Sequence, residues 1–133
     1  MATALQPLHR PTEGELEILS VIWEKEEASV REIHQALLAY KQTGYTTSLK
    51  LLQLMFEKGM VKRTERGRKH YYRSTIDKEA LEVRLTEKLT EQLFEGSPAK
   101  LAAKALNSKH YKCTREELQE LQQLIGNLLS QIS

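Results

Sequence analysis

The strongest constraint on the fold is an amphipathic segment, residues 45–58, that stops at a glycine and runs directly into a hairpin pattern. Its apolar residues recur at helical spacing, which predicts a helix with one buried face. That face holds Leu49, Leu52, Met55 and Phe56. Thr46 or Thr47 opens the helix, and the other face is left to Thr47, Ser48, Lys50 and Gln53.

Two short β-prone runs, residues 61–65 and 70–74, follow Gly59 and predict the only strand pair in the chain. Between them lies a loop of four residues, 66–69, in which Gly67 supplies a positive φ. Residues 58–73 hold one anion, Glu65, and seven cations: Lys58, Lys62, Arg63, Arg66, Arg68, Lys69 and Arg73. This charge favours a polyanionic partner; the alternative is a solvated basic hairpin without one.

Three helix starts have the spacing of a capping box, in which a hydroxyl and a carboxylate satisfy backbone donors. The pairs are Thr12 with Glu15, Ser29 with Glu32, and Thr114 with Glu117. The first helix should end near Lys25 and bury Leu16, Ile18, Leu19, Ile22 and Trp23. The second should run from Val30 to about Tyr40 and bury Val30, Ile33 and Leu37.

The remaining sequence predicts three further helices. Asp77 caps the first, which runs to about Phe94, and Gly96-Ser97-Pro98 ends it and starts the next. Apolar residues repeat along this first helix and along the last one: Leu81, Leu85, Leu89, Leu93, Leu118, Leu121, Ile125, Leu128 and Ile132. The repeat along the last helix forms an apolar seam that is too short to hold a coiled coil alone. We therefore expect this seam to pack against residues 77–94 and against a second copy of the chain. The alternative is that these helices fold back on their own N-terminal domain.

A chain of 133 residues that is 40% hydrophobic can bury one modest core with a small helical extension. The fold class is therefore mostly α with a small β-hairpin wing. We expect an N-terminal tail at 1–10, a winged helix-turn-helix domain at 11–76 and a helical dimerisation region at 77–133.

Cysteine content and hydropathy bear on the compartment. A single cysteine, Cys113, excludes an internal disulfide framework and favours a reducing compartment. No apolar run approaches the ~20 residues that cross a bilayer, and the first residues lack the order of a secretory signal. We expect a cytoplasmic protein without membrane contact.

Catalytic and metal chemistry find little support in the sequence. His110 and Cys113 have the spacing of two ligands, but a structural zinc site needs four, so an ordinary loop is the better interpretation. His34 is expected beside the core of the second helix, and His70 in the hairpin. No nucleophile, carboxylate pair or phosphate-binding glycine loop emerges, so we expect no enzyme activity, cofactor or metal.

Several motifs in order resemble the penicillinase repressor family, which comprises the BlaI/MecI/CopY repressors of beta-lactamase, methicillin-resistance and copper-transport genes. The resemblance extends from about Pro11 to Ile132. Its motifs are Pro11-Thr12-Glu13-Gly14-Glu15-Leu16-Glu17-Ile18-Leu19, Trp23, Ser29-Val30-Arg31-Glu32-Ile33, Tyr45-Thr46-Thr47, Lys58-Gly59, Gly67-Arg68 with Tyr72, and Phe94 with Gly96-Ser97-Pro98.

This resemblance implies a homodimeric winged-helix repressor on a palindromic operator. It implies that the helix start at Tyr45, Thr46 and Thr47 meets DNA, that the hairpin turn contacts the backbone, and that the C-terminal helices dimerise. The residue types agree: Ser48 and the threonine hydroxyls can bond phosphates, and Lys50 or Gln53 can reach base edges. Arg66, Arg68 and Lys69 are suited to phosphates.

Three departures from the family pattern bear on specificity and induction. Lys50 and Leu54 stand where the family commonly has threonine and arginine, so the operator need not match those of relatives. Cys113 stands alone, which argues against copper sensing. Family members that respond to antibiotics lose activity when a sensor pathway leads to cleavage, which would fall here near residues 105–108, and the Asn107-Ser108 pair differs from that site.

Two other function classes compete with DNA binding. A winged helix can serve as a protein-interaction module, but such a scaffold has no reason to keep Lys50, Arg66, Arg68 and Lys69 together. An effector-binding regulator is disfavoured because the C-terminal half is too short to enclose a pocket readily. The operator, the regulated genes and the inducing signal are not encoded in any recognisable motif.

Overall fold

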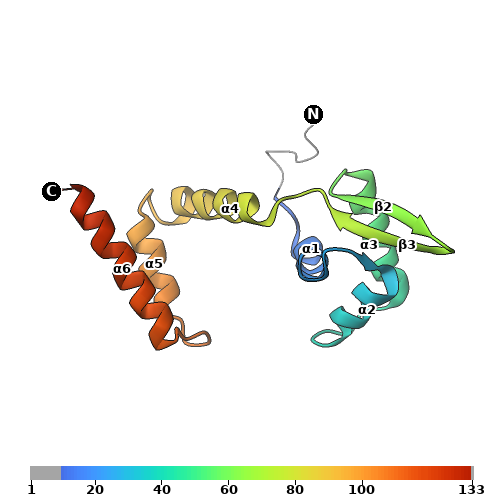
Figure 1. The fold of residues 1–133 in the computed structure, drawn as a ribbon, viewed down its shortest axis with the longest axis horizontal. Helices are drawn as coiled ribbons and strands as arrows, with labels where there is room; N and C mark the ends of the chain where they lie inside the picture. Colours follow the sequence, from blue (N-terminus) through green and yellow to red (C-terminus); the bar gives the residue numbers. More distant parts are fainter. Residues whose placement is uncertain (1–9, 133) are drawn as a thin grey trace. The chain divides into compact units, whose positions relative to one another are not determined.

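The structure, a computed structural model, describes residues 10–132 and divides into two compact units (Figure 1). The first ends at Leu85 and the second begins at Thr86. This boundary lies later than the one expected at residues 76 and 77, because Leu81 and Leu85 pack on the core of the first unit.

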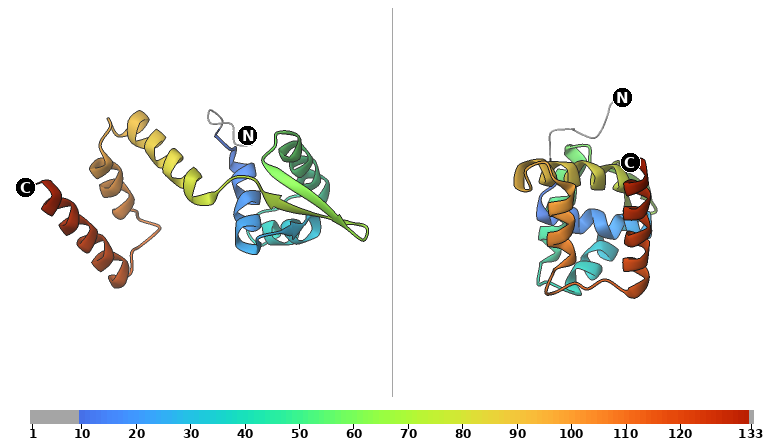
Figure 2. Two further views of the ribbon diagram at one scale, coloured as in Figure 1. Left: turned by 45° about the horizontal axis from the view of Figure 1, so that its top comes forward. Right: turned by 90° about the vertical axis from the view of Figure 1, so that its left-hand side faces the viewer.

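The first unit contains both helices and strands, as the sequence predicted. Its elements in chain order are α1 (Glu13–Lys25), β1 (Ala28–Ser29), α2 (Val30–Leu38), α3 (Tyr45–Glu57), β2 (Val61–Arg66) and β3 (Lys69–Ser74). The strands form an antiparallel sheet in the order β1-β3-β2. The tip of the β2–β3 hairpin extends beyond the helices (Figures 1 and 2). The predicted fold class, mostly helical with a hairpin wing, is confirmed.

Strand β1 was not predicted, so the expectation of a single strand pair is wrong. Its two residues pair with Tyr72 and Tyr71 of β3 and lead directly into α2. Ala28 and Ser29 carry no alternating pattern of their own, because their extended conformation depends on the hairpin beside them. The third strand ties the start of α2 to the hairpin.

The predicted capping boxes are present at all three helix starts. In the first, Glu15 N donates to Thr12 Oγ1 at 3.2 Å and Thr12 N donates to Glu15 Oε1 at 2.9 Å. The same reciprocal bonds join Ser29 with Glu32, and Thr114 with Glu117. Local hydrogen bonding therefore fixes where these helices begin.

Helix α3 and the hairpin differ in detail from the prediction. Helix α3 begins at Tyr45 after Gly44, which offers no side-chain cap, so the expected start at Thr46 or Thr47 is late. The strands extend to Arg66 and from Lys69, which leaves a turn of Gly67 and Arg68 instead of a four-residue loop. Gly67 has the expected positive φ, 64°.

The core of the first unit draws on α1, α2, α3 and the sheet. Its buried residues include Ile18, Leu19, Ile22, Ile33, Leu37, Leu52, Met55, Val61, Tyr72 and Ile76. Leu81 also lies in this core at 2% exposure. The prediction that Leu81 contributes to dimerisation is therefore wrong. Trp23 is half-buried and donates from Nε1 to Ile76 O at 3.0 Å, which ties α1 to the segment after β3.

The helices after the hairpin are α4 (Lys78–Leu93), α5 (Pro98–Leu106) and α6 (Arg115–Ile132). Asp77 caps α4 through a bond from Ala80 N at 2.9 Å. Ser97 caps α5, with Pro98 in the first turn, as predicted. No residue of α5 or α6 is buried. Within residues 10–132 the structure has no helix with the length and hydropathy of a membrane span.

Candidate nucleic-acid interface

The exposed face of α3 carries most of the side chains that the sequence assigned to it. Thr46, Thr47, Lys50 and Gln53 are exposed, and so is Tyr45. They come from successive turns of one helix whose opposite face, with Leu52 and Met55, is fully buried. The burial of that face holds α3 against the domain and leaves this row of polar groups open to a partner.

Ser48 does not belong to this row, and its prediction as an exposed residue is wrong. Its side chain is buried at 2% exposure and lies 3.3 Å from His34 Nδ1 of α2. Helical spacing places Ser48 beside Leu52 and Met55, and the hydrogen bond to His34 satisfies the buried hydroxyl. The sequence missed this because a serine at the edge of an apolar stripe reads as a polar surface residue.

His34 also contacts the first residue of α3. Its ring meets the Tyr45 ring edge to face, with centroids 5.5 Å apart. A single α2 residue thereby holds both Tyr45 and Ser48. This contact fixes the start of α3 where no side-chain cap is present.

The hairpin presents two faces because side chains alternate along a strand and cross-strand partners share a side. Arg63 pairs with the buried Tyr72 and lies with its guanidinium carbon 4.1 Å from the centre of the Phe56 ring. We call this side, which faces α3, the inner face. The outer face holds the alternate pairs, Lys62 with Arg73 and Thr64 with Tyr71.

The contact with Arg63 corrects the prediction for Phe56. The sequence placed this ring in the core, but it is 38% exposed at the end of α3. An arginine over an aromatic face gains a cation–π attraction that an aliphatic residue would not offer.

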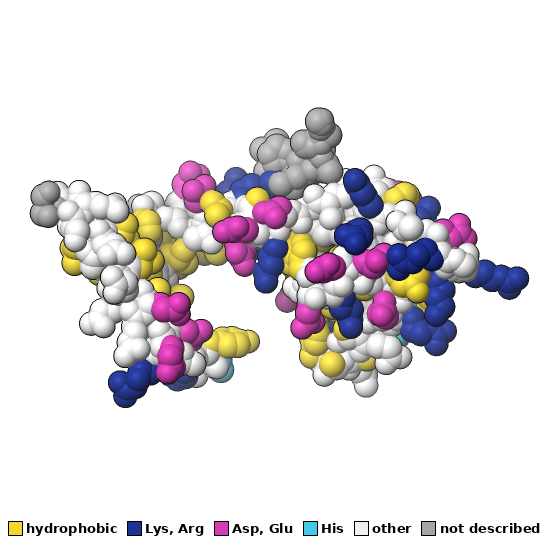
Figure 3. All heavy atoms as spheres, in the orientation of Figure 1, with side chains coloured by type: hydrophobic (Ala, Val, Ile, Leu, Met, Phe, Trp, Pro, Cys, Tyr) yellow, Lys and Arg dark blue, Asp and Glu magenta, His cyan; other side chains and the backbone are white. Residues whose placement is uncertain are grey.

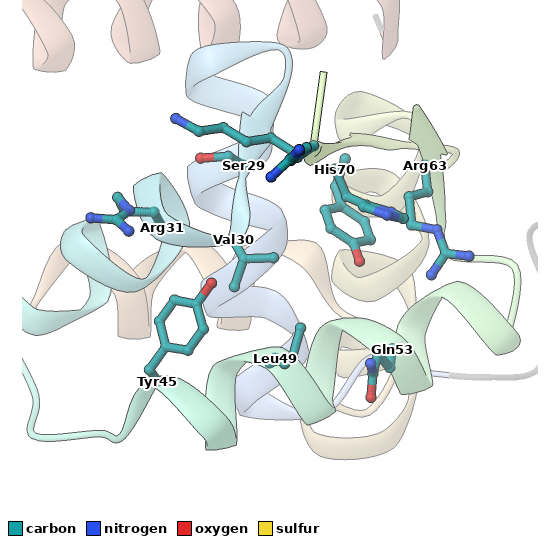
Figure 4. Close-up of a pocket in the computed structure, with 11 residues that line it drawn as sticks. Ser29, Val30, Arg31, Tyr45, Leu49, Gln53, Arg63 and His70 are labelled. Atoms are coloured by element: carbon teal, nitrogen blue, oxygen red, sulfur yellow. The ribbon is translucent and has the colours of Figure 1, made fainter. Parts of the chain in front are cut away.

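A groove of about 300 Å³ lies between the inner face, α3 and the start of α2. Figure 4 shows Tyr45 and Leu49 pointing from α3 towards Val30, with Arg63 and His70 on the hairpin side. Four cations line it, Arg31, Arg63, Arg68 and Lys69, and no acidic residue does. The other lining residues are Ser29, Val30, Tyr45, Leu49, Gln53, His70 and Tyr72.

Arg66 lies apart from this groove. Its Nη1 is 3.0 Å from Glu27 Oε2, and its guanidinium carbon is 4.1 Å from the centre of the Tyr71 ring. The predicted wing cations therefore separate: Arg68 and Lys69 reach the groove, and Arg66 is paired with an acid beside β1.

Lys58 is also engaged inside the protein. Its Nζ is 2.7 Å from Oε2 of Glu15, whose side chain is only 3% exposed. Burial raises the pKa of Glu15, but hydrogen bonds from Lys58 and Thr12 outweigh it and leave that pKa below its ordinary value. Lys58 thus links the end of α3 to the start of α1 and is a structural cation.

Sequence reasoning missed Arg31, Arg63 and His70 as groove residues. Arg31 is the second residue of α2 and 32 positions before Arg63, so only the pairing of β1 with β3 brings it near the hairpin. Arg63 could have been found by strand alternation, since it shares a side with the apolar Val61.

The second unit holds the candidate dimer surface. Among the predicted residues, Leu93, Leu118, Ile125, Leu128 and Ile132 are exposed, and Leu89 and Leu121 are half-buried. Further exposed apolar residues, missed from the sequence, are Leu106, Tyr111, Leu124 and Leu129. Hollows of roughly 720 Å³ and 540 Å³ share Leu106 and Leu121 in their linings. Figure 3 shows hydrophobic side chains on the surface of this unit, and Lys and Arg around the hairpin of the first.

Metal-binding side chains do not gather in residues 10–132: no group of three or more His, Cys, Asp or Glu there could hold an ion. Cys113 is a half-buried free thiol in the loop before α6.

Comparison with known proteins finds similarity to repressors. The family described as penicillinase repressor matches residues 11–127. A penicillinase repressor of Staphylococcus aureus is 22% identical over 116 residues, which is 86% of this chain and 90% of that protein. The match covers both the first unit and most of the C-terminal helices. This chain therefore belongs to the penicillinase repressor family, a family of transcriptional repressors.

Proposed function

We propose that this protein represses transcription as a homodimer bound to a palindromic operator in double-stranded DNA. The observation that carries the proposal is the exposed polar row on α3 beside a groove lined by four cations and no acid. An α-helix fits the major groove of B-DNA, and cations beside it can neutralise phosphates.

Within this proposal the α3 residues divide into two roles. Lys50 and Gln53 have side chains long enough to donate to base edges. Thr46 and Thr47 lie in the first turn of α3, and their side chains can bond phosphates or pack a methyl group against thymine. Ser48 leaves the predicted contact set because its hydroxyl is buried against His34.

Dimerisation is supported by the second unit, since α5 and α6 bury no residue in the single chain. The exposed seam of Leu118, Ile125, Leu128 and Ile132 gains stability only when another apolar surface covers it. A second copy offers an identical seam, and a two-fold dimer presents two α3 helices to two half-sites. This symmetry is the reason to expect a palindromic operator.

A protease from a sensor pathway is a further predicted partner, drawn from the family resemblance. Cleavage near residues 105–108 would fall where α5 ends, at Leu106 with Asn107 as its cap. Residues 105–107 are exposed in the single chain. Loss of this segment would separate α6 from the DNA-reading unit and so remove the dimer contact that the proposal requires.

The test is to incubate the purified protein with fragmented genomic DNA from its own organism at physiological salt and to sequence what it retains. A few fragments that share a two-fold motif would support the proposal and identify the regulated genes. Diffuse recovery, or none, would favour the protein-interaction alternative. Light scattering on the same preparation measures the oligomeric state, and a monomer would contradict the dimeric mechanism.

A further inference from the structure

We propose that the groove between the hairpin and α2 is the seat of one DNA backbone strand, with Arg31 and Arg63 as its phosphate-binding residues, and that Arg66 takes no part. The inference rests on the proposed function and assigns its electrostatic contacts. The sequence shows these cations as one cluster. The proposal divides them into cations that face DNA and cations, such as Arg66, that pair with acids of the protein itself.

The strand register decides which hairpin cations face α3. Arg63 lies opposite the buried Tyr72, so it shares the side of the hairpin that faces α3. Lys62 lies opposite Arg73 on the other side. A strand of DNA that contacts α3 would therefore meet Arg63 and leave Lys62 and Arg73 behind the sheet.

The groove itself has the chemistry of a phosphodiester seat. Val30, Leu49 and Tyr72 supply apolar lining, and Arg31, Arg63, Arg68 and Lys69 supply the positive charge. Glu65 pairs with His70 but does not line the groove. Arg31 stands in the first turn of α2, where the helix dipole adds partial positive charge. Lys69 pairs with Arg66 across the turn, yet its long side chain reaches the lining of the groove.

Arg63 is also preorganised for this role. Stacking over Phe56 restricts its guanidinium while leaving the residue exposed. An arginine that is already oriented loses less conformational entropy when it binds a phosphate. This contact gives Phe56 a role at the surface, although the sequence predicted that its ring would be buried in the core.

Arg66 has the opposite arrangement. The Arg66 guanidinium forms an ion pair with Glu27 and lies over the ring of Tyr71 on the outer face. To reach a phosphate, Arg66 would have to leave both partners. Its role is to hold the hairpin beside β1, since Glu27 directly precedes that strand.

The experiment compares matched neutralisations on the two sides. Arg31→Gln and Arg63→Gln remove groove cations, and Arg66→Gln and Arg73→Gln remove outer-face cations with the same change of net charge. Binding to a short duplex of arbitrary sequence is measured over a series of salt concentrations, which needs no knowledge of the operator. Each groove variant should reduce the slope of log K against log salt by about 0.9, and each outer variant by less than half of that.

Equal slopes for all four variants, or larger losses from the outer pair, would overturn the seat while leaving DNA binding intact. Failure of the wild-type chain to bind any duplex would instead overturn the proposed function and the seat with it. Phe56→Leu removes the ring that orients Arg63 but keeps the charge of Arg63. It should weaken binding about three-fold without changing the salt slope. A slope change in Phe56→Leu as large as that of Arg63→Gln would contradict the preorganisation step.

Discussion

The two compact units differ in what their apolar side chains contact. In the first, α1, α2, α3 and the sheet bury one another, and residues such as Ile18 and Leu52 are completely excluded from solvent. In the second, α5 and α6 have amphipathic sequences but contain no fully buried residue. Hydrophobic patterning therefore has two outcomes in this chain: it closes a core within the first unit, and it leaves an exposed apolar surface on the second.

The largest expected effect comes from a charge in the exposed seam. Ile125→Asp should abolish dimerisation because a carboxylate would have to be desolvated at the centre of the interface. Operator affinity should fall roughly 100- to 10,000-fold, since each monomer then binds only one half-site. Light scattering and operator binding measure the two effects.

A matched control lies on the far side of the same helix. Gln123→Asp adds the same charge to α6 on a face without apolar residues of the seam, so the dimer should persist. If both variants remained dimeric with wild-type affinity, the second copy would not be packed on this seam.

A smaller effect is expected on folding stability, and it should differ between two leucines of the α4 repeat. Leu81→Ala should destabilise the first unit by about 3 kcal/mol, because the side chain is fully enclosed in its core. Leu93→Ala should leave that unit within about 0.5 kcal/mol of wild type, since Leu93 is 68% exposed. Trp23, the single tryptophan, reports unfolding of the first unit specifically. Equal losses would show that the leucine repeat of α4 acts as one continuous surface.

Sequence specificity should be distinguishable from general affinity within the first unit. Lys50→Ala should change the preferred base at one operator position by about 2 kcal/mol, because its side chain extends from the exposed face of α3. Arg68→Ala should weaken binding to all sequences and reduce the salt slope by about 0.9. Sequencing of duplexes retained from a random pool measures the preference. An unchanged preference in Lys50→Ala would mean that α3 does not read bases.

The parts of the fold that the sequence predicted are those determined by neighbouring residues. Thr12 with Glu15 and Ser29 with Glu32 satisfy their own backbone donors, so the helix starts follow from spacing alone. Gly67 likewise marks the hairpin turn through its own φ. These local rules located α1, α2 and the hairpin, and the family resemblance indicated how they assemble.

The errors arise where a distant segment decides the environment. The buried hydroxyl of Ser48 is satisfied by His34 of α2, and Phe56 lies at the surface with Arg63 of β2 stacked on its ring. Leu81 belongs to a leucine repeat, yet it is buried in the core of the first unit. Strand β1 exists only beside β3. None of these partners can be identified from the spacing of the residues themselves.

The smallest effect concerns pH and acts on the first unit alone. The pKa of Glu15 is depressed in the folded protein, so its charged form stabilises folding at pH values above its ordinary pKa of 4.5. That contribution is lost as the pH falls through the lower folded-state pKa. Glu15→Gln keeps an acceptor for Thr12 N but loses the charge that meets Lys58, so it should cost about 1 kcal/mol at neutral pH.

The difference between Glu15→Gln and wild type should therefore shrink as the pH falls below 4.5. Urea unfolding followed by Trp23 fluorescence measures it, and Glu24→Gln, an exposed change on the same helix, controls for net charge. A difference that stays constant down to acidic pH would mean that Glu15 acts through shape and not through its charge. The link between α1 and α3 would then rest on apolar packing, and Lys58 would rejoin the cations available to DNA.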